Sequence, residues 1–340
     1  MKENVLAILR EQDAFYSGEA ISNRLGVSRT AVWKAVKSLQ QQGYLIEAVP
    51  NRGYRLAGSP DIMSETEIHL MLERARLSDE FPMTAYAAQT DSTNLMARRA
   101  AETGAPHGSL FVAGQQTAGR GRRGRAWTSQ SDQDLMFSIL LRPQAEPSAL
   151  AAVTLFAGLC AAEAVNGMIQ AADGRPNPER AGIKWPNDLV LAGSGLKIGG
   201  ILTESLVEDN RVQALIIGIG INVNAVDLPE ELAAIATSLG KACGRTFHRL
   251  DLLRLILQRF TDRKASLIHL TSLDGWLDDY RRLCLTLGRA IRVFSPDGTW
   301  QTGRAIDIDA SGELLIEDGA GCRQVIRSGE VSVRGLFGYV

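Results

Sequence analysis

Residues 119–125 concentrate positive charge and backbone freedom in one short segment. They read Gly-Arg-Gly-Arg-Arg-Gly-Arg, and Trp127 follows two positions later. Glycine permits tight turns and close approach of the backbone to a ligand, and arginine donates paired hydrogen bonds to a carboxylate or phosphate. The segment therefore predicts a flexible, cationic loop that closes over an anion. Taken alone, the same residues are equally compatible with a solvated surface loop or a non-specific nucleic-acid patch.

Three more polar clusters lie beside apolar runs in the central region. Residues 91–94 read Asp-Ser-Thr-Asn, residues 184–188 read Lys-Trp-Pro-Asn-Asp, and residues 197–200 read Lys-Ile-Gly-Gly. Each cluster also has a structural interpretation: a cap for a helix over residues 95–101, a rigid Pro-Asn turn, and an exposed hairpin lysine. Residues 193–197 lack the glycine spacing of a P-loop and the hydroxyl residue after its lysine, which excludes that assignment.

The length and composition limit the architecture. A chain of 340 residues exceeds one typical core, and roughly 150 residues per domain predict two or three domains. The net charge of -1 gives no general attraction to nucleic acid, so such binding would need a locally basic face. The N-terminus lacks a signal-peptide core, which indicates a cytoplasmic protein. Four scattered cysteines without metal-ligand spacing are expected to be reduced: Cys160, Cys243, Cys284 and Cys322.

The first sixty residues predict three helices and a hairpin. Apolar residues at positions 5, 6, 8 and 9 recur at helical spacing, Ser17 can cap a second helix over residues 19–25, and Gly26 ends it. Residues 44–49 then predict a strand, residues 50–53 a turn, and residues 54–56 the returning strand. Ser28 can cap a third helix, whose apolar face would be Ala31, Val32, Ala35, Val36 and Leu39.

This arrangement is typical of a winged helix-turn-helix, with the helix-turn-helix at about residues 18–37. Six basic residues stand against the single acid Glu47 between positions 24 and 55, so we expect a positive face that binds DNA. A module that serves only dimerisation or protein contact is the alternative. The third helix would enter the major groove and the wing would touch phosphates. The expected DNA contacts are Arg29, Thr30, Trp33, Lys34, Lys37, Arg52 and Arg55.

From about residue 62 the pattern predicts an α/β body followed by a small β-barrel. Strands are expected at residues 135–141, 189–191, 198–202 and 212–221. The apolar stretch 149–162 is shorter than the ~20 residues that cross a bilayer, so it predicts a buried helix and no membrane contact. The barrel strands are expected at residues 290–294, 300–308, 313–317, 323–326 and 331–334, with turns at 296–298 and 318–319.

Four motifs follow one another in a specific order: the glycine-arginine loop, residues 184–188, Lys-Ile-Gly-Gly-Ile-Leu-Thr-Glu at 197–204, and Gly-Ile-Gly-Ile-Asn-Val-Asn at 218–224. As a set they resemble the catalytic domain of biotin protein ligases, and with the helical module in front they are similar to the bifunctional ligase and biotin operon repressor family of bacteria. The resemblance implies an α/β (α+β) multi-domain fold. Its parts would be a winged helix-turn-helix at 1–60, a mixed-sheet biotin/lipoate ligase-like catalytic domain at 62–284, and a small SH3-like β-barrel at 285–340.

The resemblance also implies two linked activities. One is an ATP-dependent biotin protein ligase that forms biotinyl-5′-AMP and transfers biotin to a lysine of the biotin carboxyl carrier protein of acetyl-CoA carboxylase. The other is a repressor of the biotin biosynthesis operon, with biotinyl-5′-AMP as corepressor. If the adenylate orders the loop and the ordered surface favours a homodimer, it must also favour binding to a two-site operator.

The charged residues fit this chemistry. Activation of a carboxylic acid by ATP brings the carboxylate and the α-phosphate within bonding distance, so cationic side chains and Mg²⁺ must offset their repulsion. Arg120, Arg122, Lys184 and Lys197 can supply that charge, and we expect Arg120, Lys184 and Lys197 to be catalytic. A carboxylate is already ionised at neutral pH, so this step needs no general base.

The resemblance assigns the ligand contacts in two groups. Short polar side chains in the first group can satisfy a buried ureido ring. The expected biotin contacts are Ser92, Thr93, Asn94, Gln116, Arg120, Gly121, Arg122 and Lys197. The expected contacts to ATP or the adenylate are Trp127, Lys184, Asn187 and Asn222, with Asn187 also a contact for Mg²⁺. Trp127 could stack over the adenylate once the loop closes, although a single aromatic residue is more often part of the core.

Two other classes of function stay open. A lipoate ligase would share the fold and the adenylation chemistry, but the arginine-glycine loop and residues 184–188 fit the biotin branch better. A noncatalytic, ligand-sensing repressor would lose its ATP-handling groups, whereas Lys184, Asn187 and Lys197 are all present. The stretch 171–181, with two prolines, looks like an enlarged loop before residues 184–188.

Overall fold

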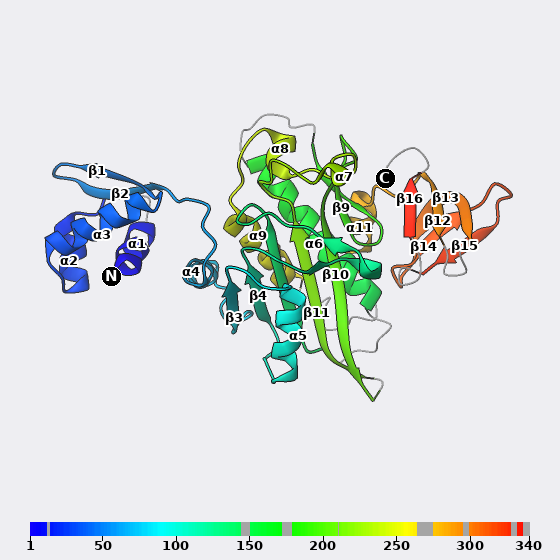
Figure 1. Ribbon diagram of the computed structural model, residues 1–340, viewed down its shortest axis with the longest axis horizontal. Coiled ribbons are helices and arrows are strands. Elements are labelled where there is room, and N and C mark those ends of the chain that lie inside the picture. The colour runs from blue at the N-terminus through cyan, green and yellow to red at the C-terminus, as the bar shows by residue number, and fades with distance from the viewer. Residues whose placement is uncertain are drawn as a thin grey trace. The chain divides into compact units, whose positions relative to one another are not determined.

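The computed structural model describes residues 1–11, 14–143, 150–171, 179–209, 211–263, 275–294, 299–327 and 332–335, the last four as backbone only. The chain divides into two compact units, Met1–Ile62 and Met63–Val340. Figure 1 shows the elements of each unit in chain order. The predicted turn at 296–298, and most of the predicted enlarged loop at 171–181, lie outside the described residues.

The first unit contains three helices and a two-stranded hairpin. The elements are α1 (Lys2–Glu11), α2 (Gly18–Leu25), α3 (Arg29–Gln41), β1 (Leu45–Val49) and β2 (Gly53–Gly58). Ser17 accepts a hydrogen bond from the Ala20 amide at 3.0 Å, and Ser28 accepts one from the Ala31 amide at 3.2 Å. Gly26 ends α2 with a φ of 65°, a left-handed conformation that glycine adopts without strain. The predicted caps and helix end are confirmed.

The helices of this unit enclose their own core. Val5, Leu6, Ile8 and Leu9 of α1 are buried, as the spacing predicts. The apolar face of α3 is also confirmed, except that Ala31 is only half-buried: its buried members are Val32, Ala35, Val36 and Leu39. Strands β1 and β2 pair antiparallel and form the predicted wing.

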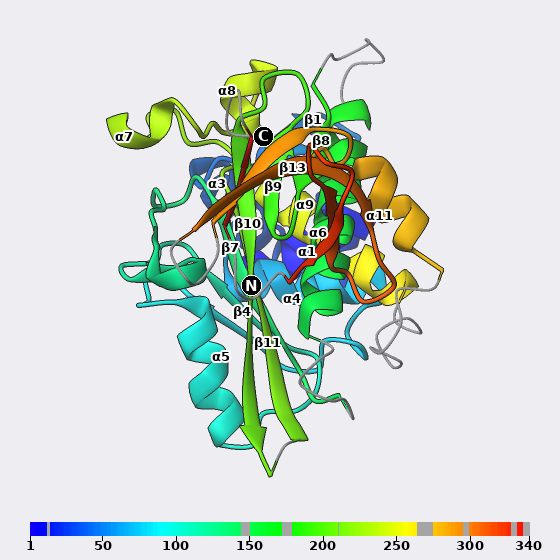
Figure 2. The same cartoon turned by 90° about the vertical axis from the view of Figure 1, so that its right-hand side faces the viewer.

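A seven-stranded mixed sheet forms the centre of the second unit. Its order is β3-β4-β7-β11-β10-β9-β8, and β3 pairs parallel with β4 while the other neighbours pair antiparallel. The longest pair, β10 with β11, extends as a hairpin (Figure 2). The strands are β3 (Thr84–Ala87), β4 (Ser109–Ala113), β7 (Leu135–Leu141), β8 (Ala181–Lys184), β9 (Asp188–Leu191), β10 (Lys197–Glu208) and β11 (Arg211–Ile221).

Helices cover both faces of this sheet. Leu215 and Ile217 of β11 belong to the core that contains α4 (Glu65–Ala75), α6 (Leu150–Ala171), α9 (Arg249–Asp262) and α11 (Leu277–Leu283). The alternate residues Ala214 and Ile216 pack in a separate cluster with α5 (Thr93–Glu102). Because successive strand residues point to opposite faces, α5 and α6 lie on opposite sides of the sheet.

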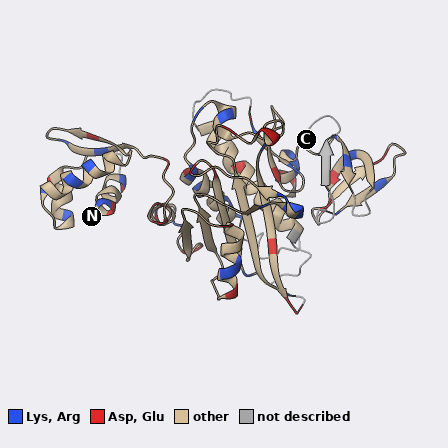
Figure 3. Cartoon of the chain, viewed as in Figure 1, with Lys and Arg blue, Asp and Glu red and all other residues tan. Residues whose placement is uncertain are grey.

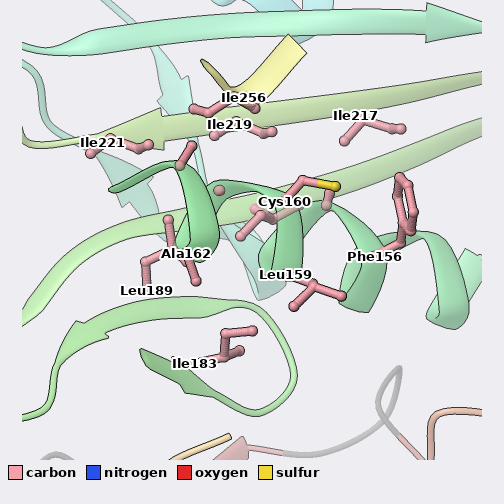
Figure 4. Packing of buried hydrophobic residues seen from close by; sticks show 14 of the residues in the cluster. Phe156, Leu159, Cys160, Ala162, Ile183, Leu189, Ile217, Ile219, Ile221 and Ile256 are labelled. Atoms are coloured by element: carbon pink, nitrogen blue, oxygen red, sulfur yellow. The ribbon is translucent and has the colours of Figure 1, made fainter. Parts of the chain in front are cut away.

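Helix α6 is the central core element (Figure 4), where Phe156 and Cys160 face the isoleucines of β11. The predicted buried helix is confirmed, but the expectation that it is too short to span a bilayer is wrong. By length and composition alone, Ala151–Ala171 is long and apolar enough to span a bilayer. However, 72% of its most apolar 18-residue stretch is buried inside the protein. These contacts identify it as a core helix.

Burial of the Cys160 side chain raises the pKa of its thiol, and all four cysteines are free.

The C-terminal strands form a five-stranded antiparallel sheet in the order β15-β14-β13-β12-β16. Their limits agree with the predicted ones to within one residue: β12 (Ala290–Phe294), β13 (Trp300–Ile308), β14 (Leu314–Glu317), β15 (Arg323–Ile326) and β16 (Ser332–Gly335). The Trp185 indole donates to the Gly312 carbonyl at 3.0 Å, and Arg281 pairs with Asp307 at 2.7 Å. These bonds join this sheet to the rest of the second unit.

Candidate functional site

A cavity of about 550 Å³ opens where the predicted motifs meet in the second unit. The start of α5, the arginine loop, residues 184–188 and the ends of β10 and β11 form its walls. Every residue predicted to bind biotin, ATP or the adenylate lines it: Ser92, Thr93, Asn94, Gln116, Arg120, Gly121, Arg122, Trp127, Lys184, Asn187, Lys197 and Asn222. Segments that are more than 100 residues apart in sequence thus reach one site; Asn94 and Glu204, for example, are 110 positions apart and bonded.

The arginine loop folds as a narrow hairpin. Strand β5 (Gly119–Arg120) pairs with β6 (Ala126–Trp127), and the Gly121 amide donates to the Arg125 carbonyl at 2.7 Å. Arg122 Nη1 donates to Asn187 Oδ1 at 3.0 Å, and burial lowers the pKa of this guanidinium. The Arg123 guanidinium lies 5.6 Å from the centre of the Phe294 ring. The loop is therefore anchored both to residues 184–188 and to the C-terminal sheet.

The start of α5 is organised by neighbours of Ser92 rather than by its hydroxyl. Ser92 occupies the N-cap position, but its side chain makes no cap hydrogen bond. Gln116 Oε1 instead accepts from the Thr93 amide at 2.8 Å and from Thr93 Oγ1 at 3.1 Å. Asp91 accepts from the Ser92 amide at 2.7 Å, and its hydrogen bonds with Arg99 hold the pKa of that carboxyl well below its usual range. The helix also begins at Thr93, two residues before the predicted start.

A buried polar network connects this helix start to the sheet. Asn94 Nδ2 donates to Glu204 Oε2 at 2.7 Å, and Asn94 Oδ1 accepts from Ser138 Oγ at 2.7 Å. The same Ser138 oxygen lies 2.8 Å from Thr93 Oγ1, and Ser138 is fully buried. Because a buried amide must satisfy both its donor and its acceptor, these bonds fix Asn94 between α5, β7 and β10. They also set the side chains at one end of the cavity.

Cationic groups gather at the other end. Lys184 is 5% exposed at the end of β8. Lys197 Nζ lies 2.6 Å from Asp188 Oδ1 and 5.7 Å from the centre of the Trp127 ring. The side chains of this ion pair are 24% and 17% exposed, so their charges are only partly screened by water. Positive charge held in such a place stabilises anions more strongly than charge on an open surface.

Trp127 packs against the backbone of β11. A Cβ atom added at Gly220 would lie 2.8 Å from Trp127 Cε2, so only glycine allows the indole this close. The Trp127 Nε1 is buried and has no hydrogen-bond partner among the described residues. The ring is thus a rigid part of the cavity wall.

The Asn187 side chain connects the arginine loop to β10 by hydrogen bonds. Its Oδ1 accepts from Arg122, and its Nδ2 donates to the Ile201 carbonyl at 3.0 Å. Over the described ranges, no three His, Cys, Asp or Glu side chains gather in a metal-binding cluster.

The cavity also includes residues that the motifs do not predict. Arg292 of β12 lines it from the C-terminal sheet, and Leu228, Leu232 and Ile235 line it from the segment around α7 (Glu230–Ala233). These residues lie in no motif, and only the packing of distant segments brings them to the site. For Arg292, the sequence offers only its place as a basic residue in the alternating pattern of the predicted strand 290–294.

The predicted DNA contacts of the first unit lie on α3 and in the wing. On α3 they are all exposed: Arg29, Thr30, Trp33, Lys34 and Lys37. Lysine and arginine are distributed over the helices of this unit (Figure 3). In the wing, Arg52 lies 4.4 Å from the centre of the Phe15 ring, and Arg55 is bonded to Glu47 at 3.0 Å.

Known families match three parts of the chain. The Biotin/lipoate A/B protein ligase family matches residues 86–222, an HTH domain matches residues 2–55, and the Biotin protein ligase C terminal domain matches residues 286–334. The first of these contains most of the cavity.

Individual relatives align over nearly the whole chain. The chain is 39% identical over 315 residues to the bifunctional ligase/repressor BirA of Bacillus subtilis, which covers 92% of each protein. It is 27% identical over 339 residues to the BirA of Escherichia coli, covering 98% of this chain and 99% of that protein. Among solved structures, the biotin protein ligase from Aquifex aeolicus in complex with biotin and ATP is similar with a TM-score of 0.61 and 29% identity. This match covers 75% of this chain and 100% of that one.

Proposed function

Because the chain belongs to the family of bifunctional biotin ligases and repressors, we propose that its cavity is the site where biotin is activated by ATP. The protein is a biotin protein ligase that forms biotinyl-5′-AMP and transfers biotin to a lysine of the biotin carboxyl carrier protein of acetyl-CoA carboxylase. It is also a DNA-binding repressor of the biotin biosynthesis operon, with biotinyl-5′-AMP as corepressor. The convergence of Arg122, Lys184 and Lys197 on one cavity carries the proposal for the site.

The end of the cavity at α5 fits the biotin head. Ser92, Thr93 and Gln116 can exchange hydrogen bonds with a ureido ring, whose polar atoms would otherwise be desolvated without partners. Asn94 acts through the network with Ser138 and Glu204, since both ends of its amide already bind protein groups. The arginine loop, with Arg120, Gly121 and Arg122, covers the bound acid. Lys197 then meets the carboxylate.

The reaction in this site is a displacement at phosphorus. An oxygen of the biotin carboxylate attacks the α-phosphate of ATP, and pyrophosphate leaves. The acceptor lysine amine then attacks the carbonyl carbon of the adenylate, and AMP leaves. Lys197 and Lys184 stabilise the anions in the first step by charge alone. Trp127 and Asn222 contact the adenosine part, and the loop keeps water from the reactive mixed anhydride.

Asn187 would hold Mg²⁺ together with the phosphates of the nucleotide. Mg²⁺ usually keeps several water ligands and binds substrate phosphates together with few protein groups. Asn187 lines the cavity and would exchange its bond with Arg122 for a contact to the hydrated ion. The ion supplies positive charge to the phosphates.

Regulation links the two units through the adenylate. The adenylate orders the arginine loop, the ordered surface favours a homodimer, and the dimer binds a two-site operator through α3 and the wing. The exposed residues of α3 support this assignment, and so does Arg52. ATP, the carrier protein and the operator all belong to the cytoplasm, which we propose as the location.

A transfer assay tests the proposed function. The protein is incubated with ATP, Mg²⁺, biotin and a purified carrier domain, and biotin on the domain is detected by intact-mass analysis. Attachment to one lysine is expected, and it should vanish when that lysine is replaced by arginine. A carrier domain that stays unmodified would refute the ligase assignment.

A further inference from the structure

Asp134 is a buried carboxylate that has no role in the proposed reaction. It is 2% exposed and ends the turn 131–134, directly before β7. A buried carboxylate is unfavourable unless hydrogen bonds and an opposite charge compensate for its lost hydration. Its partners therefore indicate what it stabilises.

Its two oxygens bind backbone amides from two different segments. Asp134 Oδ2 accepts from the Gln130 amide at 2.9 Å, and Oδ1 accepts from the Val223 amide at 3.3 Å. Gln130 follows Trp127 by three residues, and Val223 directly follows Asn222. Trp127 and Asn222 both line the cavity. One carboxylate thus ties together the two segments that carry the proposed adenosine contacts.

Other contacts couple the same segments. The Asn224 amide donates to the Gln133 carbonyl at 2.9 Å, and the Gln130 side chain donates to the Asp227 carbonyl. Leu228, next in the chain, lines the cavity. A displacement of the turn would therefore move both walls of the cavity together.

A compensating charge lies beside this carboxylate. Burial raises the pKa of Asp134 to about 6, and the charge of Arg249 on α9 opposes the shift. Arg249 is 1% exposed, and its Nη1 lies 3.7 Å from Asp132 Oδ1. Tyr86 of β3 flanks the same cluster, and burial, followed by the charge of Asp132, raises its pKa. Arg249, Asp132 and Tyr86 thus form a charged and titratable group next to Asp134.

We propose that Asp134 is a positioning residue for the nucleotide half of the cavity. By holding the Gln130 and Val223 amides it sets the separation of Trp127 and Asn222. The inference rests on the proposed assignment of those two residues to the adenylate. Loss of either hydrogen bond loosens the nucleotide walls, whereas the start of α5 keeps its own bonds to β7 and β10 at the biotin end.

Steady-state kinetics of adenylate formation provide the first test. D134A removes both acceptors and should raise the KM for ATP about tenfold, with the KM for biotin changed by less than about threefold. D134N keeps the shape and one acceptor, so its effect should be smaller. D132N changes the same charge two residues away, on a side chain that is 63% exposed, and should behave as wild type. An unchanged KM for ATP in D134A, or an equal rise for both substrates, would overturn the inference.

The pH profile adds a second signature. At pH 7 Asp134 is ionised and accepts both amides, and below about pH 6 it gains a proton and resembles asparagine. The ratio of the KM for ATP in D134N to that in wild type should therefore fall toward one as the pH drops from 7 to 5. Taking the ratio cancels the titration of ATP itself. A ratio that is constant over this range contradicts the inference.

Hydrogen exchange tests the same bonds without substrate. In D134A and D134N, peptides that span residues 127–133 and 220–226 should exchange faster than in wild type and D132N. Unchanged protection in both variants would refute the positioning role, and D134N decides the outcome if D134A does not fold. Failure of the wild-type protein to adenylate biotin would instead refute the proposed function and leave the exchange result standing.

Discussion

Replacement of Lys197 by methionine should cripple adenylate formation without unfolding the protein. Methionine keeps an unbranched apolar side chain of similar length but removes the ammonium group, whose Nζ lies 2.6 Å from Asp188 Oδ1. A unit charge about 4 Å from an anion in surroundings of intermediate dielectric contributes about 4 kcal/mol. Because 1.36 kcal/mol corresponds to a tenfold change in rate, kcat/KM for biotin should fall by about 10²- to 10³-fold.

Part of this loss comes from Asp188. Without Lys197, its carboxylate, 17% exposed, would face the anionic substrates. K197M/D188N should therefore recover about tenfold over K197M, as a double-mutant cycle of biotin-dependent pyrophosphate release can show. K241M removes an exposed lysine of helix α8 (Leu239–Cys243) and serves as the matched control. A K197M enzyme within threefold of wild type, or no recovery in the double variant, would refute the electrostatic role.

Three further outcomes are expected. R120A should release biotinyl-5′-AMP faster and lower operator occupancy together; an unchanged release rate, measured by chase with unlabelled biotin, would break the proposed link. K34A should weaken operator binding and reduce its salt slope by about one while ligase activity stays at the wild-type level, as fluorescence anisotropy over a salt series can test. The pKa of Asp134 is raised above 3.8 on folding, so its contribution to unfolding free energy should fall as pH rises from about 4 to about 6, by on the order of 1–3 kcal/mol. Urea titrations should show wild type losing unfolding free energy relative to D134N over that window, and a difference independent of pH contradicts the sign.

Local signals explain why much of the fold could be predicted. The caps at Ser17 and Ser28 and the break at Gly26 depend on side chains within a few residues of one another. The strands of the C-terminal sheet alternate between buried and exposed positions, which period-two patterning reveals. Helix α6 lacks such a signal because it is apolar on nearly every side, so its extent to Ala171 could not be deduced from a one-sided pattern.

The motifs predict which residues line the site, but they do not predict the hydrogen bonds that these residues make. Glycine, arginine and lysine in characteristic order indicate an anion site, and those residues line one cavity. The amide of Thr93, the first residue of α5, donates its hydrogen bond to Gln116 and not to the cap residue Ser92. Gln116 lies 23 positions away in the sequence, so the local sequence does not predict this bond. Arg292 lines the cavity, and Asp134 bonds to segments that line it, only because distant segments pack together. The sequence near each residue does not reveal these contacts.

The cavity is proposed to make an acyl-adenylate from biotin. The most direct measurement incubates the protein with ATP, Mg²⁺ and either biotin or lipoate, and identifies the product by mass spectrometry. Biotinyl-5′-AMP should form with biotin and no adenylate should form with lipoate. Lipoyl-AMP as the main product would assign the site to a lipoate ligase, and no adenylate with either acid would contradict the catalytic account and favour a noncatalytic repressor.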